Sequence, residues 1–140
     1  MYVLDTNVLS ELMHATPNPT VLAWVDSQSA HELFVSAITR GEIELGIALL
    51  PAGKRKTSLA SQAGAVFEED FSGRCLPFDE TSASLYAALV SQRTRQGRPI
   101  SVEDAQIAAI SLRNGKILVT RNMADFEKIE GLNLLSPWPD

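Results

Sequence analysis

The sequence lacks the marks of secreted and membrane-spanning proteins. Cysteine occurs only once, as Cys75, so no disulfide can form within the chain, which fits a protein of the reducing cytoplasm. Apolar runs such as Ile47–Leu50 are far shorter than the ~20 residues that a membrane-spanning helix requires. No basic segment followed by an apolar one stands at the N-terminus, so we expect no signal peptide. We therefore predict a cytoplasmic protein without a membrane partner.

The sequence also lacks the short motifs that identify several enzyme classes. It has no glycine-rich phosphate-binding loop, no GxSxG nucleophile motif and no pairing of cysteine with histidine that indicates a catalytic thiol. Its two histidines, His14 and His31, are not spaced as zinc ligands. Internal repeats and low-complexity segments are absent as well.

Basic residues are fewer than acidic residues. Lysine and arginine total 12 against 17 aspartates and glutamates, which gives a net charge of −5. This balance argues against a protein that coats nucleic acid through charge alone, because the phosphate backbone attracts basic surfaces. It is compatible with an enzyme that handles nucleic acid through bound cations. In that case part of the acidity belongs to a metal site.

What the chain does contain is an alternation of short apolar runs and helical patterns. Its 140 residues, 45% of them hydrophobic, suffice for one domain over residues 1–140 with a sizeable core. Because no hairpin dipeptide joins two of the apolar runs, we predict an α/β fold with a central parallel sheet of about five strands, flanked by helices on both faces. The expected strands are Tyr2–Leu4, Leu33–Ser36, Arg74–Phe78, Lys116–Thr120 and Leu132–Leu135. The expected helices cover residues 8–12, 19–28, 37–50, 58–71, 80–96 and 101–114, and residues 121–126 form a turn into a short helix.

The first twelve residues, MYVLDTNVLSEL, place a carboxylate at the end of a strand. The apolar run up to Leu4 leads directly into Asp5, and the polar pair Thr6–Asn7 follows before a helical pattern begins at Val8. Ligands of parallel α/β sheets bind at the carboxyl ends of the strands. We therefore expect Asp5 to face a surface crevice at that edge.

A second carboxylate, Glu42, lies in the predicted helix over residues 37–50. Ile38, Glu42, Leu45 and Leu49 are separated by 4, 3 and 4 positions, so they share one face of the helix. A carboxylate is costly to bury without a partner, which makes a glutamate in an apolar stripe unusual. We therefore predict that Glu42 is available to something positive. A solvated glutamate on an ordinary helix is the alternative interpretation.

Two further aspartates complete a set of four acidic side chains, Asp5, Glu42, Asp104 and Asp125. Asp104 opens the helix before the fourth strand and Asp125 follows that strand, so a parallel sheet would bring all four to one edge. Two carboxylates about 5 Å apart repel each other by roughly 3 kcal/mol at an effective dielectric constant of ~20, so protons or a cation must compensate. An all-oxygen set suits Mg²⁺ or Mn²⁺, which bind a phosphodiester oxygen and activate a water for attack on phosphorus.

Three of these residues also have a structural interpretation as helix caps. Asp5 can cap the first helix, and Ser101–Asp104 has the spacing of a capping box. Asn122 and Asp125 have the same spacing. Taken singly, capping is the favoured explanation of the last two aspartates, so the functional signal lies in the set of four.

The basic and aromatic residues carry weaker signals. Lys54–Lys56 is interpreted as a solvated turn, with a phosphate contact as the alternative. Trp24 and Trp138 are expected in the core or at an interface. Four arginines are candidates for the rim of a substrate groove, although a solvated face is favoured for the first three: Arg93, Arg95, Arg98 and Arg121.

Four segments together resemble the PIN-domain family, with the closer likeness to its branch of VapC- and FitB-type toxins. They are LDTNVLSEL from Leu4, SAITRGEIELGI from Ser36, EDAQIAA from Glu103 and LVTRNMADF from Leu118. The likeness covers nearly the whole chain, including the tryptophan near its end. Although DTN alone is a weak motif, the four segments together are highly specific.

The resemblance implies a metal-dependent endoribonuclease that is the toxin of a type II toxin–antitoxin pair. It also implies a cognate antitoxin, often with a DNA-binding half, and a homodimer. The acidic positions of the family match Asp5, Glu42, Asp104 and Asp125. The polar residues after the first aspartate match Thr6 and Asn7, and the TRN element that supports the pocket matches Thr120 and Asn122.

Arg40 departs from the family pattern, because relatives more often carry a small or apolar residue there. A cation two residues before Glu42 raises the question of whether it alters metal affinity. Arg40 and Glu44 are four positions apart on another face of the helix, so we expect them to pair with each other and to leave Glu42 unaffected.

We predict a Mg²⁺- or Mn²⁺-dependent endonuclease of single-stranded RNA, with a metal-activated water as the nucleophile. Asp5 and Asp104 are the expected main ligands, whereas Glu42 and Asp125 hold a second ion or orient the attacking water. Two rival hypotheses stay open. A phosphatase of the haloacid dehalogenase kind requires a second aspartate where Asn7 stands, and a binding module uses the acidic pocket only to receive a basic peptide.

Overall fold

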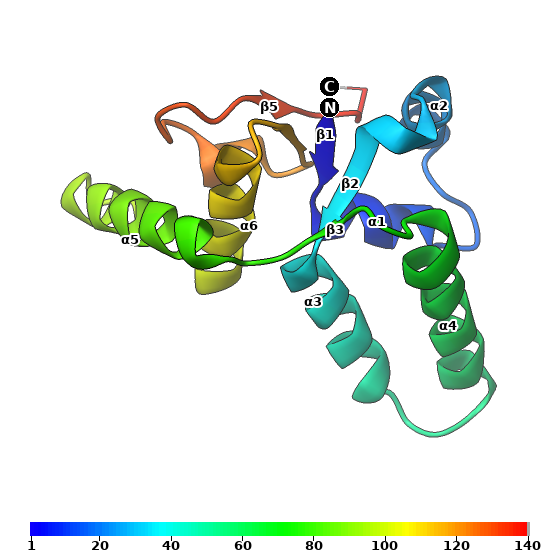
Figure 1. Ribbon diagram of the computed structural model, residues 1–140. Coiled ribbons are helices and arrows are strands. Elements are labelled where there is room, and N and C mark those ends of the chain that lie inside the picture. Colours follow the sequence, from blue (N-terminus) through cyan, green and yellow to red (C-terminus); the bar gives the residue numbers. More distant parts are fainter. Residues whose placement is uncertain (140) are drawn as a thin grey trace.

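The computed structural model describes residues 1–139 and places a five-stranded parallel sheet at the centre of the molecule (Figure 1). The strand order is β3-β2-β1-β4-β5, and every neighbouring pair is parallel. The strands are β1 (Tyr2–Leu4), β2 (Leu33–Ser36), β3 (Cys75–Leu76), β4 (Ile117–Val119) and β5 (Leu134–Leu135). The predicted α/β fold with a parallel sheet is therefore confirmed.

Six α-helices connect the strands within the described residues. They are α1 (Thr6–Leu12), α2 (Pro19–Ser27), α3 (Ala37–Ala48), α4 (Lys54–Ala65), α5 (Glu80–Arg95) and α6 (Val102–Arg113). Shorter helical turns are η1 (Ala30–Glu32), η2 (Val66–Asp70) and η3 (Met123–Phe126). Side-chain oxygens cap the starts of several helices, namely Asn18, Ser36, Asp79 and Ser101. In residues 1–139, no helix has both the length and the apolar character to cross a membrane.

Alternating side chains of the central strands build a core on each face of the sheet. Leu4 and Val119 belong to a cluster that includes residues of α1, α2 and α4, whereas Val3 and Leu118 belong to a cluster with residues of α5 and α6. Figure 1 shows these two groups of helices on opposite sides of the strands. The period of two in a strand therefore explains why short, wholly apolar strands are covered on both faces, as predicted.

The central strand β1 lies at the point where the strand order reverses. The chain runs from β1 outward to β2 and β3, and it then returns to β4 on the other side of β1. Asp5 follows β1 and Thr120 follows β4, and the Asp5 N–H donates to the Val119 carbonyl at 2.9 Å. Such a switch point opens a crevice at the carboxyl ends of the strands, so the fold places Asp5 where parallel sheets bind their ligands.

The fourth helix begins earlier than predicted. It starts at Lys54 and not at Ser58, so the basic residues belong to its first turn, where Lys54 and Arg55 are exposed as predicted. The Lys56 ammonium donates to the Ala48 carbonyl at 3.0 Å, at the end of α3. The last carbonyls of a helix lack intrahelical partners, so this hydrogen bond satisfies one of them and connects the first turn of α4 to the end of α3.

The third strand is shorter than the predicted Arg74–Phe78. Only Cys75–Leu76 pairs with β2, as an edge strand of the sheet. Pro77 follows and has no N–H to donate, so the chain leaves the sheet there and reaches α5 at Glu80.

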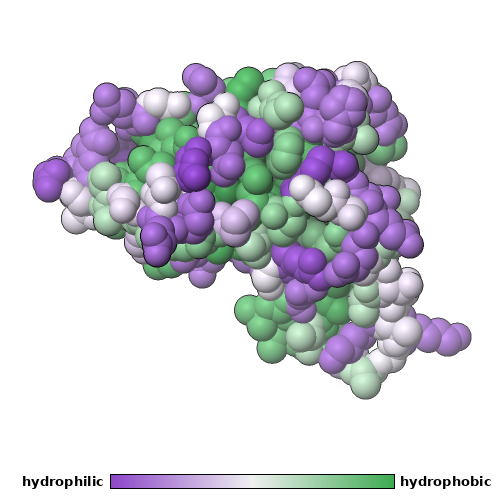
Figure 2. All heavy atoms as spheres, viewed as in Figure 1, coloured by the Kyte–Doolittle hydropathy of each residue, from purple (hydrophilic) through white to green (hydrophobic). Residues whose placement is uncertain are grey.

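The apolar stripe around Glu42 is not buried as its pattern suggests. Leu45 is 59% exposed and Leu49 is 76% exposed, whereas the buried positions of α3 are Thr39 and Ile43. The far half of α3 extends beyond the strands alongside α4 (Figure 1), and Figure 2 shows a hydrophobic patch at that end. Periodicity identifies a helix face but not whether another element covers it. The argument for Glu42 from an apolar stripe is therefore wrong, and its placement depends on other contacts.

Candidate active site

A pocket of about 410 Å³ lies at the carboxyl ends of β1 and β4. The predicted carboxylates that line it come from three elements, and they are Asp5 after β1, Glu42 on α3 and Asp104 in the first turn of α6. The predicted polar side chains that line it are Thr6, Asn7 and Asn122. The fold thus collects residues that are far apart in the sequence in one place.

The fourth carboxylate, Asp125, lies in an adjoining pocket. That pocket, of about 260 Å³, is lined by both Asp104 and Asp125, so Asp104 connects the two spaces. Asn122 makes no side-chain capping bond at the start of η3, although the Asp125 N–H donates to its carbonyl at 3.1 Å. The capping-box interpretation of Asn122 and Asp125 is therefore wrong.

The Asp5 carboxylate is buried and held by two hydrogen bonds. Asp5 is 4% exposed, its Oδ1 accepts from the Thr6 N–H at 2.8 Å, and its Oδ2 accepts from the Thr120 hydroxyl at 2.8 Å. Burial raises the pKa of Asp5 to about 6, which the two hydrogen bonds oppose and the nearby Asp104 and Glu42 reinforce. Asp5 therefore caps α1 and also presents a carboxylate whose charge is disfavoured in the absence of a cation.

A chain of hydroxyl groups fixes Glu42 against α1. The Thr6 hydroxyl donates to Glu42 Oε1 at 2.6 Å and lies 2.9 Å from the buried Thr39 hydroxyl. The Ser36 hydroxyl in turn donates to Thr39 at 3.4 Å. Sequence analysis missed Thr39, although its position three residues before Glu42 puts both on one side of α3. These contacts hold Glu42 at the pocket without a positive charge.

Thr120 is the junction of the polar residues at the end of β4. Its hydroxyl donates to Asp5, and it accepts from the Asn122 N–H at 3.1 Å and from the Asn7 side-chain amide at 3.3 Å. The Asn7 amide oxygen accepts from the Arg121 N–H at 3.3 Å. The residues after β1 and the residues after β4 are thus bonded to each other across the crevice, which fixes the position of the Asp5 carboxylate.

The start of α6 holds Asp104. The Ser101 hydroxyl caps the helix by accepting from the Asp104 N–H at 3.2 Å, as predicted. Burial raises the pKa of the Asp104 carboxyl, the Ser101 hydroxyl lowers it, and repulsion from Asp125 and Glu42 raises it further. The acidic side chains therefore oppose one another's ionisation.

A buried arginine ties together the segments that carry Asp104 and Asp125. Arg93, near the end of α5, is 4% exposed, and it donates to the Arg98 carbonyl at 2.8 Å and to the Glu127 carbonyl at 2.9 Å. Arg98 and Glu127 also form an ion pair at 3.3 Å. The prediction of a solvated face is wrong for Arg93, because two backbone carbonyls satisfy its guanidinium inside the protein.

No lysine, arginine or histidine of residues 1–139 forms an ion pair with any of the four predicted carboxylates. Arg40, two residues before Glu42, pairs with Glu44 at 3.2 Å, as predicted, and with Glu68 at 2.7 Å. In the same part of the chain, no three Asp, Glu, His or Cys side chains are arranged so that they could hold a metal ion. The carboxylates therefore share a region of uncompensated negative charge without forming a complete coordination shell.

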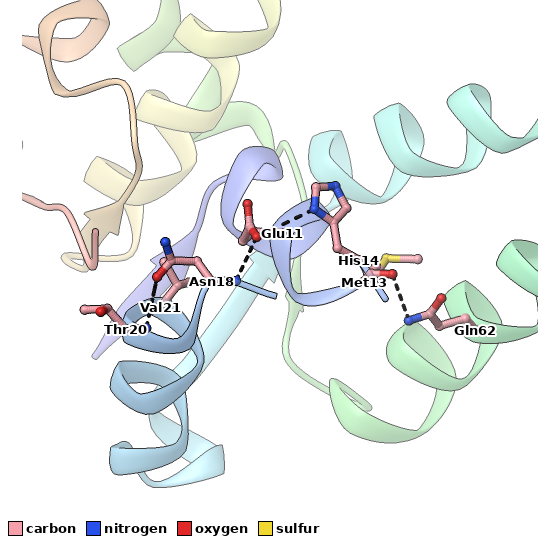
Figure 3. A network of polar contacts seen from close by, with 7 residues as sticks. All are labelled: Glu11, Met13, His14, Asn18, Thr20, Val21 and Gln62. Carbon is pink, nitrogen blue, oxygen red and sulfur yellow. Dashed lines mark hydrogen bonds and ion pairs between the residues drawn. The ribbon is translucent and has the colours of Figure 1, made fainter. Parts of the chain in front are cut away.

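Sequence analysis also missed Glu11 and His14, which line the pocket from the α1 side. Glu11 Oε2 accepts from the Asn18 N–H at 2.9 Å and lies 3.6 Å from His14 Nδ1, so Glu11 joins α1 to the start of α2 (Figure 3). The Gln62 amide donates to the Met13 carbonyl at 3.3 Å and connects α1 to α4. Glu11 is thus engaged in holding helices together. Glu11 and His14 are three positions apart, and this spacing puts two side chains on the same side of a helical segment. The spacing is the sequence pattern that could have identified them.

A larger pocket, of about 560 Å³, lies between α1, α2 and α4. Its lining is mainly apolar and includes Leu9, Leu12, Val66 and Phe71. It contains none of the predicted site residues, so its chemistry is that of a hydrophobic surface and not of a reaction centre.

Comparisons with known proteins find relatives in both sequence and structure. A sequence profile of the PIN domain matches residues 2–132. The VapC ribonuclease Y4jK of Sinorhizobium fredii is 41% identical over 138 residues, which cover 99% of this chain and 98% of that protein. The toxin FitB of Neisseria gonorrhoeae is 38% identical over 140 residues and 100% of both chains. A crystal structure of FitAcB from Neisseria gonorrhoeae matches with a TM-score of 0.90 at 37% identity, again over 100% of both chains.

The raised pKa of Asp5 predicts how stability depends on pH when divalent metal is removed. The folded pKa of about 6 exceeds the ordinary value of 3.8, so between these values the folded state binds more protons than the unfolded state. The free energy of unfolding should therefore fall as pH rises through this interval, by on the order of 3 kcal/mol. Urea unfolding in EDTA across the interval measures the fall, which Asp5→Asn should remove.

Asp79→Asn is the matched control for this experiment. Hydrogen bonds from Ser82 hold the pKa of Asp79 below its usual value, so the stability that Asp79 contributes is lost only at lower pH. Between pH 3.8 and about 6, the free energy of unfolding of Asp79→Asn should therefore fall by as much as that of the parent protein. Identical pH profiles for the parent and Asp5→Asn would contradict the raised pKa.

Arg93→Met should destabilise the protein more than other arginine substitutions on α5. The change leaves the Arg98 and Glu127 carbonyls without their donor, and an unsatisfied buried group costs about 1–3 kcal/mol. Arg95→Met, at an exposed position of the same helix, should change the free energy of unfolding by less than about 0.5 kcal/mol. Urea titrations compare the two, and equal losses would refute the structural role of Arg93.

Proposed function

The chain belongs to the PIN-domain family, and from this we propose that it is a divalent-metal-dependent endoribonuclease, the toxin of a toxin–antitoxin pair. The observation that carries the proposal is the uncompensated acidic pocket at the carboxyl ends of β1 and β4. The full-length relatives named VapC ribonuclease and toxin FitB support the RNA substrate and the toxin role.

The chemistry of the donor set fits Mg²⁺ or Mn²⁺. Asp5, Glu42, Asp104 and Asp125 offer only oxygen atoms, and hard divalent cations prefer oxygen ligands and keep several waters. In this proposal Asp5 and Asp104 are the main ligands, and Glu42 and Asp125 hold a second ion or orient the attacking water. When bound, the ion supplies positive charge for the phosphodiester oxygens and makes water a better nucleophile near neutral pH.

The contacts within the chain prepare the carboxylates for this role. The Thr6 N–H and the Thr120 hydroxyl hold Asp5 in one orientation, and the Thr6 hydroxyl holds Glu42. Because burial raises the pKa of Asp5 to about 6, Asp5 must release a proton before it can bind a cation at mildly acidic pH. Cation affinity should therefore increase as pH rises through this value.

The environment of Asn7 argues against a phosphatase of the haloacid dehalogenase kind. That mechanism needs a second aspartate at this position, whereas the Asn7 amide donates to Thr120 and accepts from the Arg121 N–H. Asn7 thus supports the pocket and carries no acidic group. The other alternative, a binding module that receives a basic peptide, requires neither metal nor RNA cleavage.

We expect the parent protein to cleave single-stranded RNA in the presence of Mg²⁺ or Mn²⁺. Asp5→Asn and Asp104→Asn should each reduce the cleavage rate by more than about 100-fold, because each removes a proposed ligand. Asp79→Asn makes the same charge change outside the pocket and should cleave like the parent. Circular dichroism of each variant checks that it is folded.

Three measurements distinguish the hypotheses. Asp5→Asn that cleaves as fast as the parent refutes the assignment of the pocket. Transfer of a phosphoryl group from acetyl phosphate to Asp5 favours the phosphatase. Binding of a partner protein by a parent that neither binds metal nor cleaves RNA favours the binding module.

We also propose that a cognate antitoxin binds this chain and that the free toxin is a homodimer. The solved relatives include FitAcB and FitAB bound to a DNA fragment, and both match nearly the whole chain. Co-expression with the product of the neighbouring open reading frame should yield a complex whose RNA cleavage is suppressed, and light scattering of the toxin alone should give twice the chain mass. Cleavage that the neighbouring product leaves unchanged would refute its assignment as the antitoxin.

A further inference from the structure

Arg121 differs from the other residues that line the acidic pocket. It follows β4 directly and is exposed. Among the described residues that line the pocket, it alone carries a permanent positive charge. It forms no ion pair with a carboxylate of residues 1–139, although Asp5, Glu42 and Asp104 line the same pocket. A guanidinium that is not used to neutralise these carboxylates is available to an anion from outside.

An aromatic ring holds this guanidinium in place. The Arg121 Cζ lies 5.1 Å from the centroid of the Trp138 ring, within the range of a cation–π contact. Trp138 is itself anchored, because it packs against the core cluster that contains Leu4 and Val119. A guanidinium carries five N–H donors, so one that lies over an aromatic ring can still donate to the oxygens of a phosphate.

The backbone of Arg121 is fixed as well. Its N–H donates to the Asn7 amide oxygen at 3.3 Å, and the Asn122 N–H donates to the Thr120 hydroxyl at 3.1 Å. These bonds belong to the network that also positions Asp5. The placement of the guanidinium relative to the acidic pocket is therefore set by the same contacts that build the crevice.

The acidic pocket creates a need for such a cation. RNA carries a negative charge at each phosphate, and an acidic site in a protein of net charge −5 repels it. A divalent ion held by the carboxylates, as proposed above, would offset this repulsion only close to the ion. The neighbouring phosphates of the strand require a separate positive group, and Arg121 is placed at the pocket to supply it.

We propose that Arg121, stacked on Trp138, binds a phosphate of the RNA strand next to the phosphate that is cleaved. This inference rests on the proposed function, because it assigns a substrate contact of the same pocket. Arg121 positions the strand and takes no part in bond cleavage. Its loss therefore weakens RNA binding and raises KM more than it lowers kcat.

The test is the binding of a fluorescein-labelled single-stranded RNA to the Asp5→Asn protein, followed by anisotropy at several KCl concentrations. Adding Arg121→Gln should weaken binding by about tenfold or more, because a hydrogen-bonded contact between charged groups is lost. The slope of log affinity against log salt should become shallower by about 0.7, the value for one phosphate contact on a single strand. Adding Arg95→Gln removes the same charge at an exposed position of α5 and should leave both quantities nearly unchanged.

Trp138 provides a second readout, which a purely structural role would not produce. Trp138→Phe keeps a ring, whereas Trp138→Leu removes the stacking partner of the guanidinium. Trp138→Leu should weaken RNA binding when Arg121 is present and have little effect in the Arg121→Gln protein, and Trp138→Phe should lie between the parent and Trp138→Leu. Additive effects of the Arg121 and Trp138 substitutions would contradict the proposed pairing.

The outcomes separate this inference from the proposed function. Equal affinity and equal salt slope for Arg121→Gln and Arg95→Gln overturn the inference. If the parent protein still cleaves RNA with Mg²⁺ in that case, the proposed function stands without it. A parent protein that neither binds nor cleaves RNA overturns both.

Discussion

The hydrogen bond from the Thr120 hydroxyl to Asp5 Oδ2, at 2.8 Å, joins the ends of the two adjacent central strands β1 and β4. It holds a carboxylate that burial would otherwise favour in its neutral form, and burial is the dominant reason that its pKa is raised. The same hydroxyl accepts from Asn7 and from Asn122, so hydrogen bonds join the segments after both strands. This junction fixes the position of Asp5 in the pocket that Glu42 and Asp104 also line.

The arginines near the pocket show how the protein keeps its carboxylates uncompensated. Arg40 is occupied by two surface glutamates, and Arg93 is occupied by two backbone carbonyls. Arg121 lines the pocket but stacks on Trp138. None of these three arginines forms an ion pair with one of the four carboxylates. Negative charge is therefore concentrated in this pocket, and the carboxylates repel one another.

The features that the sequence predicted correctly depend on local chemistry. The apolar run before Asp5, the Ser101 cap of α6 and the Arg40–Glu44 pair all involve residues within four positions of each other, and all are present. Some of the errors involve contacts between distant segments. The sequence predicts a solvated face for Arg93, whereas its guanidinium is buried. Its two acceptors lie five and 34 positions away, and no local pattern indicates these contacts.

The sequence by itself determined a parallel α/β fold and the set of acidic and polar residues at the ends of its strands, because periodicity and capping act over a few residues. Only the tertiary structure decided that β1 lies between β2 and β4, which brings Thr120 to Asp5. It also decided that Asp125 lines a pocket beside that of Asp5 and Glu42, joined to it through Asp104. Strand order and the coverage of helix faces depend on packing between distant segments. A local sequence pattern does not specify which distant segments pack against each other.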